Sequence, residues 1–66
     1  MRLTLKQARN LNGETQLEIS QKMGVSRDVY RRIEKNPGSA TIDQALLLSK
    51  ILGLPVSNLF FGENST

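Results

Sequence analysis

Residues that start helices and residues that stop them alternate along this chain, and the intervals between them fit only short helices. Thr15 and Glu18 stand three residues apart in the pattern of a capping box, in which each side chain accepts the other residue's backbone N–H. Gly24 can adopt the left-handed backbone that ends a helix, and Ser26 is a favourable residue for starting the next one. The spacing therefore predicts two short helices joined by a glycine turn.

Residues that start and end helices also recur through the rest of the chain. Asn12 and Gly13 follow a segment with apolar residues spaced by three, Thr41 precedes a longer apolar segment, and Gly53 follows that segment. The pattern predicts an all-α fold with no strands and with five helices, at about residues 3–12, 16–23, 27–35, 42–52 and 56–60. We expect one folded domain over residues 1–61 and a loose polar tail at 62–66.

Composition excludes several classes of protein. The 66 residues suffice for one small domain, and they include no cysteine and no histidine. Disulfide scaffolds, zinc fingers and Cys/His catalytic arrangements therefore lack their reagents, and apolar packing must supply the stability. No apolar run approaches the length of a membrane span, and the first residues lack the apolar stretch of a secretion signal, so none is expected. We expect a soluble protein in the cytosol, without a cofactor or a bound metal.

The basic residues are concentrated in one predicted helix. Nine Lys and Arg against six Asp and Glu give a formal net charge of +3, which suits a polyanionic partner. Four of the nine basic residues fall within one short stretch: Arg27, Arg31, Arg32 and Lys35. On a helical wheel, Tyr30 and Ile33 share the apolar side and these basic residues lie on the other sides. The helix at 27–35 therefore has one face for a core and one face for a charged partner.

The segment TQLEISQKMGVSRDVYRRIE, residues 15–34, resembles the helix-turn-helix of the lambda-repressor/Cro-like (XRE-type) regulators. The later segment ALLLSKILGLPVSNLF is similar to the hydrophobic ending of that family, so the resemblance covers roughly residues 3–61. It implies a five-helix domain that binds double-stranded DNA by sequence, with the helix at 27–35 in the major groove. The implied function is that of a small transcriptional regulator, in the first place a repressor, from a bacterial, phage or plasmid system.

The resemblance also implies which residues read the bases. The positions that the family points at base edges correspond to Ser26, Arg27, Asp28 and Arg32. A guanidinium can donate two hydrogen bonds to O6 and N7 of guanine, and a carboxylate can accept one from cytosine N4. Asp28 also precedes Arg31 and Arg32 by three and four residues, so an ion pair that merely orients an arginine is an equal alternative for it.

A second set of positions is implied to meet the phosphates: Gln16, Arg31, Lys35, Asn36 and Ser39. Gln16 starts a helix, where backbone amides and the helix dipole favour an anion, although an ordinary solvated residue is the alternative. The connection after the basic helix holds Pro37 and fewer cations than relatives often carry. Binding would then depend mainly on the helix itself.

Three further residues are expected to have structural roles. Arg9 and Glu34 match an arginine and a glutamate that the family pairs, so we expect a partly buried ion pair that holds the helix at 27–35 against the first helix. Tyr30 stands where relatives more often have isoleucine or valine. Core packing is its expected role, and its hydroxyl must find a partner or reach the edge of the domain.

One helix in a groove reads few base pairs, so the resemblance implies a homodimer on a palindromic operator with half-sites about 34 Å apart. The expected dimer contact lies near the end of the domain, at Pro55, Phe60 and Phe61. Phe61 folding back over the core is an equal alternative.

Other functions remain open from the sequence. A helix-turn-helix fold can serve as a modulator or antirepressor that binds a protein partner, or as an antitoxin that represses its own promoter. An enzyme is the least favoured class, because no nucleophile stands with a base and no glycine-rich phosphate loop is present. No small-molecule ligand is indicated.

Overall fold

The computed structural model describes residues 3–61, and of residues 60 and 61 it describes only the backbone. Within this range all regular structure is helical: α1 (Leu5–Leu11), α2 (Gln16–Met23), α3 (Arg27–Lys35), the 3-10 turn η1 (Pro37–Ser39), α4 (Ile42–Leu52) and the π-helical turn η2 (Ser57–Phe61). The predicted all-α fold is confirmed for these residues. The predicted tail at 62–66 and the first two residues of the predicted domain lie outside the described residues.

The helix starts are set by local side-chain caps. Thr15 and Glu18 form the predicted capping box, and Thr41 forms another with Gln44. The box at Thr41 and a third one, at the start of α1, were not predicted. Thr4 Oγ1 accepts the Gln7 backbone N–H at 3.1 Å, and Gln7 Oε1 accepts that of Thr4 at 2.9 Å. Helix α1 therefore begins at residue 5, later than the predicted start at residue 3, because Thr4 holds the extended backbone of a cap.

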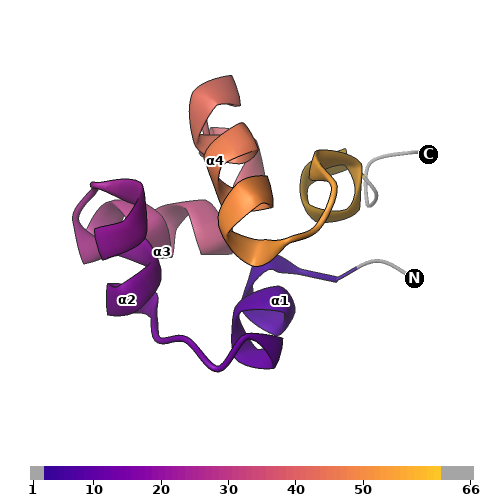
Figure 1. The fold of residues 1–66 in the computed structure, drawn as a ribbon. Coiled ribbons are helices and arrows are strands. Elements are labelled where there is room, and N and C mark those ends of the chain that lie inside the picture. Colours follow the sequence, from indigo (N-terminus) through magenta and orange to yellow (C-terminus); the bar gives the residue numbers. More distant parts are fainter. Residues whose placement is uncertain (1–2, 62–66) are drawn as a thin grey trace.

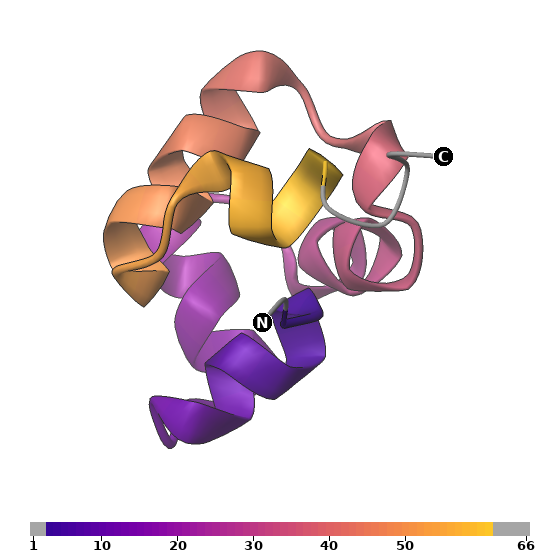
Figure 2. The same ribbon diagram turned by 90° about the vertical axis from the view of Figure 1, so that its right-hand side faces the viewer.

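The helix pair and its turn form as expected. Gly24 has φ of +76°, which ends α2 in the left-handed conformation, and α3 begins three residues further on, at Arg27. Helix α2 packs against both α3 and α4. Figure 1 shows α2 and α3 together at the left of the molecule, α1 to the right of α2, and α4 above. Figure 2 shows η2 lying between α4 and α1.

One apolar core joins every helix of the described chain. Its buried members are Leu5, Ala8, Ile19, Met23, Tyr30, Ile33, Leu48, Leu52 and Leu59. Three apolar residues that the sequence pattern included in helix faces lie on the surface instead: Leu11, Ile42 and Leu46. They stand near helix ends or on the outer side of α4, where no other described element covers them. The core fixes α3 through one of its sides and leaves the other side to solvent.

Candidate nucleic-acid interface

Helix α3 separates its residues sharply between core and solvent. Tyr30 and Ile33 are buried, whereas every charged residue except Glu34 is exposed. The exposed polar residues that begin or line the outer side are Ser26, Arg27, Asp28, Arg31, Arg32 and Lys35. The four residues predicted to read bases therefore lie on one continuous exposed part of α3 and its cap.

The cap of α3 uses Ser26. Its Oγ accepts the Val29 backbone N–H at 3.2 Å, which satisfies one of the donors left open at the start of a helix. The hydroxyl hydrogen remains available, because capping uses the oxygen as an acceptor. Arg27 follows at the exposed N-terminal tip of α3 and makes no ion pair with any residue in the range 3–61.

Asp28 faces Arg31 across one turn of α3. The Asp28 Oδ1 to Arg31 Nη2 distance is 3.6 Å, and the two side chains are 74% and 63% exposed. An ion pair so open to water contributes little to stability. Either partner can therefore exchange this contact for one with a ligand at small cost. Arg32, the other arginine within reach of Asp28 along the helix, makes no ion pair with the described residues.

At the other end of α3, Glu34 collects hydrogen bonds from three directions. Arg9 Nε donates to its Oε2 at 2.8 Å, Tyr30 Oη donates to the same oxygen at 2.7 Å, and Gln16 Nε2 donates to Oε1 at 2.8 Å. Arg9 also donates through Nη1 to the backbone carbonyl of Glu14 at 2.9 Å. The structure thus brings Arg9 and Glu34 together and joins α1, the start of α2 and α3 at one carboxylate. We call Arg9, Gln16, Tyr30 and Glu34 the Glu34 network.

The charges of the Glu34 network match its bonding. Burial raises the pKa of the Glu34 carboxyl, but the hydrogen bonds from Arg9, Tyr30 and Gln16 outweigh it and hold that pKa below its ordinary value. The hydrogen bond to Glu34 raises the pKa of Arg9. Burial, followed by the hydrogen bond to the Glu34 carboxylate, raises the pKa of Tyr30. The network therefore holds one carboxylate, one guanidinium and one neutral hydroxyl at neutral pH.

The sequence did not identify the hydrogen-bond partner of the Tyr30 hydroxyl or of the Gln16 side-chain amide, and for both the partner is Glu34. The side chain of Tyr30 is fully buried, and its hydroxyl bonds to Glu34 rather than reaching the domain edge. Gln16, predicted to contact a phosphate, holds Glu34 with one amide hydrogen. Its second amide hydrogen can donate a hydrogen bond to an anion, as can the open backbone N–H groups at the start of α2.

The connection after α3 is a tight turn. Pro37 begins η1, and Ser39 donates through its backbone N–H and its hydroxyl to the carbonyl of Asn36, at 2.9 Å and 2.8 Å. Asn36, Ser39 and Lys35 are all exposed. The side chain of Asn36 makes no hydrogen bond with the residues that the structure describes. This turn therefore presents polar groups beside the C-terminal end of α3.

An open depression of about 720 Å³ lies beside the outer side of α3. Its lining residues come from three helices: Lys6, Gln16, Asp28, Arg31, Arg32, Glu34 and Lys35. Lys6 is not among the residues that the sequence predicts to contact DNA. The residues around an exposed lysine of α1 do not predict which other helix it lies beside. Its position near α3 follows only from the way α1 packs in the fold.

The expected dimer contact is only partly described. Pro55 lies exposed between α4 and η2, and the side chains of Phe60 and Phe61 lie outside the described residues. No helix in the range 3–61 is long and apolar enough to cross a membrane. The same residues hold no group of three carboxylates that could bind a metal ion.

A glycine turn between two short helices, with the second helix exposed and basic, defines a helix-turn-helix domain. The family model described as "Helix-turn-helix" matches residues 5–59. An uncharacterized HTH-type transcriptional regulator of Methanocaldococcus jannaschii is 31% identical over 64 residues, which is 97% of this chain and 97% of that protein. The comparison with solved structures gave no match.

The chain belongs to the helix-turn-helix family, in its lambda-repressor-like (XRE) branch. Membership confirms the resemblance drawn from residues 15–34 and from the hydrophobic ending. DNA binding in the regulation of transcription is the broad function that the comparisons support.

Proposed function

We propose that this protein binds double-stranded DNA in a sequence-specific manner and represses transcription, with α3 in the major groove. The observation that carries the proposal is the exposed side of α3. Arg27 and Arg32 project from it without an ion pair to any described residue, while the opposite side is fixed by the core and the Glu34 network. A rigid helix with free guanidinium groups on one side can donate paired hydrogen bonds to guanine.

The proposal assigns two kinds of contact. Base edges are read from the start and the outer side of α3: Ser26, Arg27, Asp28 and Arg32. Phosphates on either side of the groove are met at the start of α2, on α3 and in the turn that follows: Gln16, Arg31, Lys35, Asn36 and Ser39. Phosphate contacts set the register of α3, and base contacts set the sequence preference. The name of the M. jannaschii relative supports a regulatory role.

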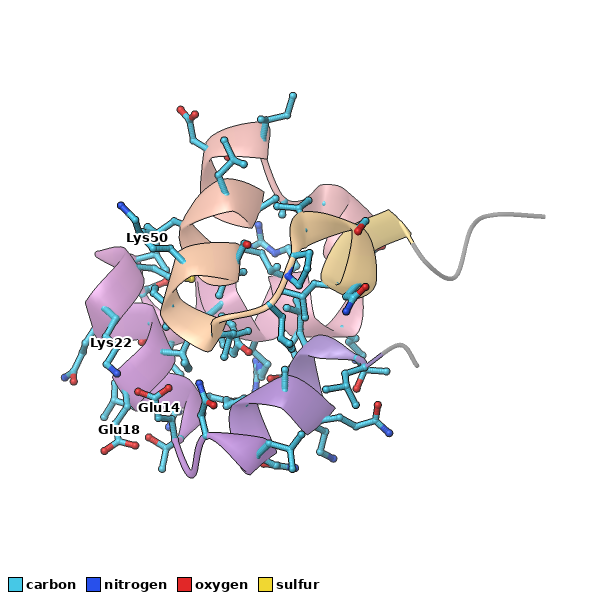
Figure 3. All side chains as sticks on the ribbon, turned by 45° about the vertical axis from the view of Figure 1, so that its right-hand side comes forward. Glu14, Glu18, Lys22 and Lys50 are labelled. Atoms are coloured by element: carbon cyan, nitrogen blue, oxygen red, sulfur yellow. The ribbon has the colours of Figure 1, made fainter. Side chains whose placement is uncertain are left out.

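The test is selection of the purified protein against a random duplex DNA library at about physiological salt. A double variant, Arg27→Ala with Arg32→Ala, runs in parallel. A second double variant, Lys22→Ala with Lys50→Ala, removes the same charge from residues that line no part of the depression beside α3 and are labelled in Figure 3. Thermal melting checks that each variant folds.

We expect the protein and the lysine control to enrich one motif, and the arginine variant to lose it. An equally enriched motif in the arginine variant would show that α3 does not read the bases. If the folded protein retains no DNA from the library, DNA binding is contradicted. The search would then turn to a protein partner, as for an antirepressor or an antitoxin.

We further propose that the protein acts in the cytosol as a homodimer on a palindromic operator, through contacts near Pro55, Phe60 and Phe61. The selected motif tests this proposal directly. An inverted repeat with half-sites about 34 Å apart is the expected result, because two copies of α3 related by a two-fold axis must enter the groove on the same side of the duplex. A motif without symmetry would contradict the dimer.

A further inference from the structure

Lys6 is a cation that the contacts proposed above do not use. It lies in the first turn of α1 and is exposed, yet it lines the same depression as Arg31, Arg32 and Lys35 of α3. Gln16, at the start of α2, lines that depression too. The fold therefore places a lysine from one helix beside three basic residues from another and beside a proposed phosphate contact.

The carboxylates in the depression leave three of these four cations without an ion pair to the described residues. Both oxygens of Glu34 accept hydrogen bonds within the Glu34 network, and Glu34 is paired with Arg9. Asp28 lies 3.6 Å from Arg31. Lys6, Arg32 and Lys35 make no ion pair with the residues that the structure describes. The depression therefore carries an excess of positive charge that is open to an anion from solvent.

The position of Lys6 is also fixed relative to α3. The ion pair of Arg9 with Glu34 ties α1 to α3, and Leu5 next to Lys6 is fully buried in the core. The lysine stem remains free to turn, but its Cα cannot move away from the depression without breaking these contacts. A flexible ammonium on a fixed base suits a phosphate, which needs a positive charge and no exact angle.

We propose that Lys6 binds a phosphate of the DNA backbone, on the strand that passes the start of α2. The contact extends the interface from α2 and α3 to α1. This inference rests on the proposed function, because it requires α3 in the groove. A phosphate contact contributes affinity for any sequence and makes binding sensitive to salt, whereas a base contact changes the preferred sequence.

The experiment measures fluorescence anisotropy with two labelled duplexes, the selected motif and a scrambled version, over a series of salt concentrations. The variants are Lys6→Ala, Lys6→Arg and the matched control Lys50→Ala, which removes one lysine away from the depression. Loss of one phosphate contact lowers the steepness of log K against log salt by about 0.9 and weakens binding about threefold to tenfold. The proposed homodimer loses one such contact in each subunit, so the steepness should fall by about 1.8 per bound dimer and binding should weaken about tenfold to a hundredfold.

We expect Lys6→Ala to show this loss equally for both duplexes, Lys6→Arg to keep the salt dependence, and Lys50→Ala to weaken binding less than about twofold. A Lys6→Ala variant that matches Lys50→Ala, or that weakens only the selected duplex at unchanged salt dependence, would overturn the inference and leave the proposed function in place. A folded wild-type protein that binds neither duplex would overturn both.

Discussion

Glu34 and Asp28 are both carboxylates of α3 that face an arginine, and their surroundings differ completely. Glu34 lies 2.8 Å from Arg9, and the two side chains are 8% and 11% exposed. Asp28 lies 3.6 Å from Arg31, and these side chains are mostly in water. Glu34 joins three helices, whereas Asp28 joins two residues of one helix. The same pairing of charges thus supports the fold at one end of α3 and leaves the other end free for a ligand.

The difference has a physical cause. In a partly buried site each charge depends on its partner for the hydrogen bonds that water no longer supplies, so the contacts become specific and rigid. In water each charge keeps its solvation, and the pair forms and breaks easily. Substitutions that remove the Glu34 carboxylate, the Asp28 carboxylate or the Tyr30 hydroxyl test this difference.

The largest effect is expected for Glu34→Ala. The change leaves the Arg9 guanidinium, the Tyr30 hydroxyl and the Gln16 amide without their acceptor in a partly buried site. We expect the free energy of unfolding to fall by about 2–4 kcal/mol, measured by urea denaturation. A loss of less than about 0.5 kcal/mol would place Glu34 in the same class as a surface carboxylate such as Asp28.

Protonation of Glu34 should have a related and smaller effect, because the neutral acid keeps some of the hydrogen bonds. The pKa of Glu34 is lowered in the folded protein, so its stabilisation is fully present above the pKa of the unfolded chain. This stabilisation is lost as the pH falls from the unfolded pKa, near 4.5, through the lower pKa of Glu34 in the folded protein. Stability measured against pH should therefore decrease more steeply at acid pH in the wild type than in Glu34→Gln. Identical slopes would contradict the prediction.

Tyr30→Phe should lower stability by about 1 kcal/mol, because it removes one buried hydrogen bond to a charged acceptor and keeps the ring in the core. Thermal or urea unfolding measures the loss. Combined with Glu34→Ala, the substitution should add almost nothing, since its partner is already gone. Fully additive losses would show that the Tyr30 hydroxyl acts independently of Glu34.

The smallest effect on stability is expected for Asp28→Ala, at less than about 0.5 kcal/mol, because the pair with Arg31 is exposed. Its effect should appear in DNA selection instead, as a changed preference at one position of the motif. A stability loss comparable to that of Glu34→Ala would remove the distinction between the two ends of α3. An unchanged motif would limit Asp28 to orienting Arg31.

The fold could be predicted to a large extent because its signals are local. Thr15 and Glu18 cap α2 across three residues, and Gly24 and Ser26 end one helix and start the next within the same short segment. Such interactions depend on the backbone of neighbouring residues and hardly on the rest of the fold. The missed start of α1 is of the same local kind: Thr4 and Gln7 stand in the capping pattern, with glutamine in place of glutamate.

The residues of the candidate interface could be selected from the sequence only through the family resemblance, together with the basic side of the helix at 27–35. Their local contacts could be predicted, such as the cap formed by Ser26 and the pairing of Asp28 with an arginine one turn later, but contacts with distant parts of the chain could not. The bond of Gln16 to Glu34 joins residues 18 apart, and that of Arg9 to Glu34 joins residues 25 apart. The resemblance implied the second pair, and nothing in the sequence implied the first.

The amino-acid sequence by itself determined the helices, their order and the charged side of α3, because capping, glycine turns and helical periodicity act within a few residues. Only the tertiary structure decided which carboxylate is buried and which is free, that Tyr30 and Gln16 share one acceptor, that Leu11 and Ile42 face solvent, and that Lys6 lies beside the basic residues of α3. These properties depend on how helices distant along the chain pack together, and no local pattern specifies that packing.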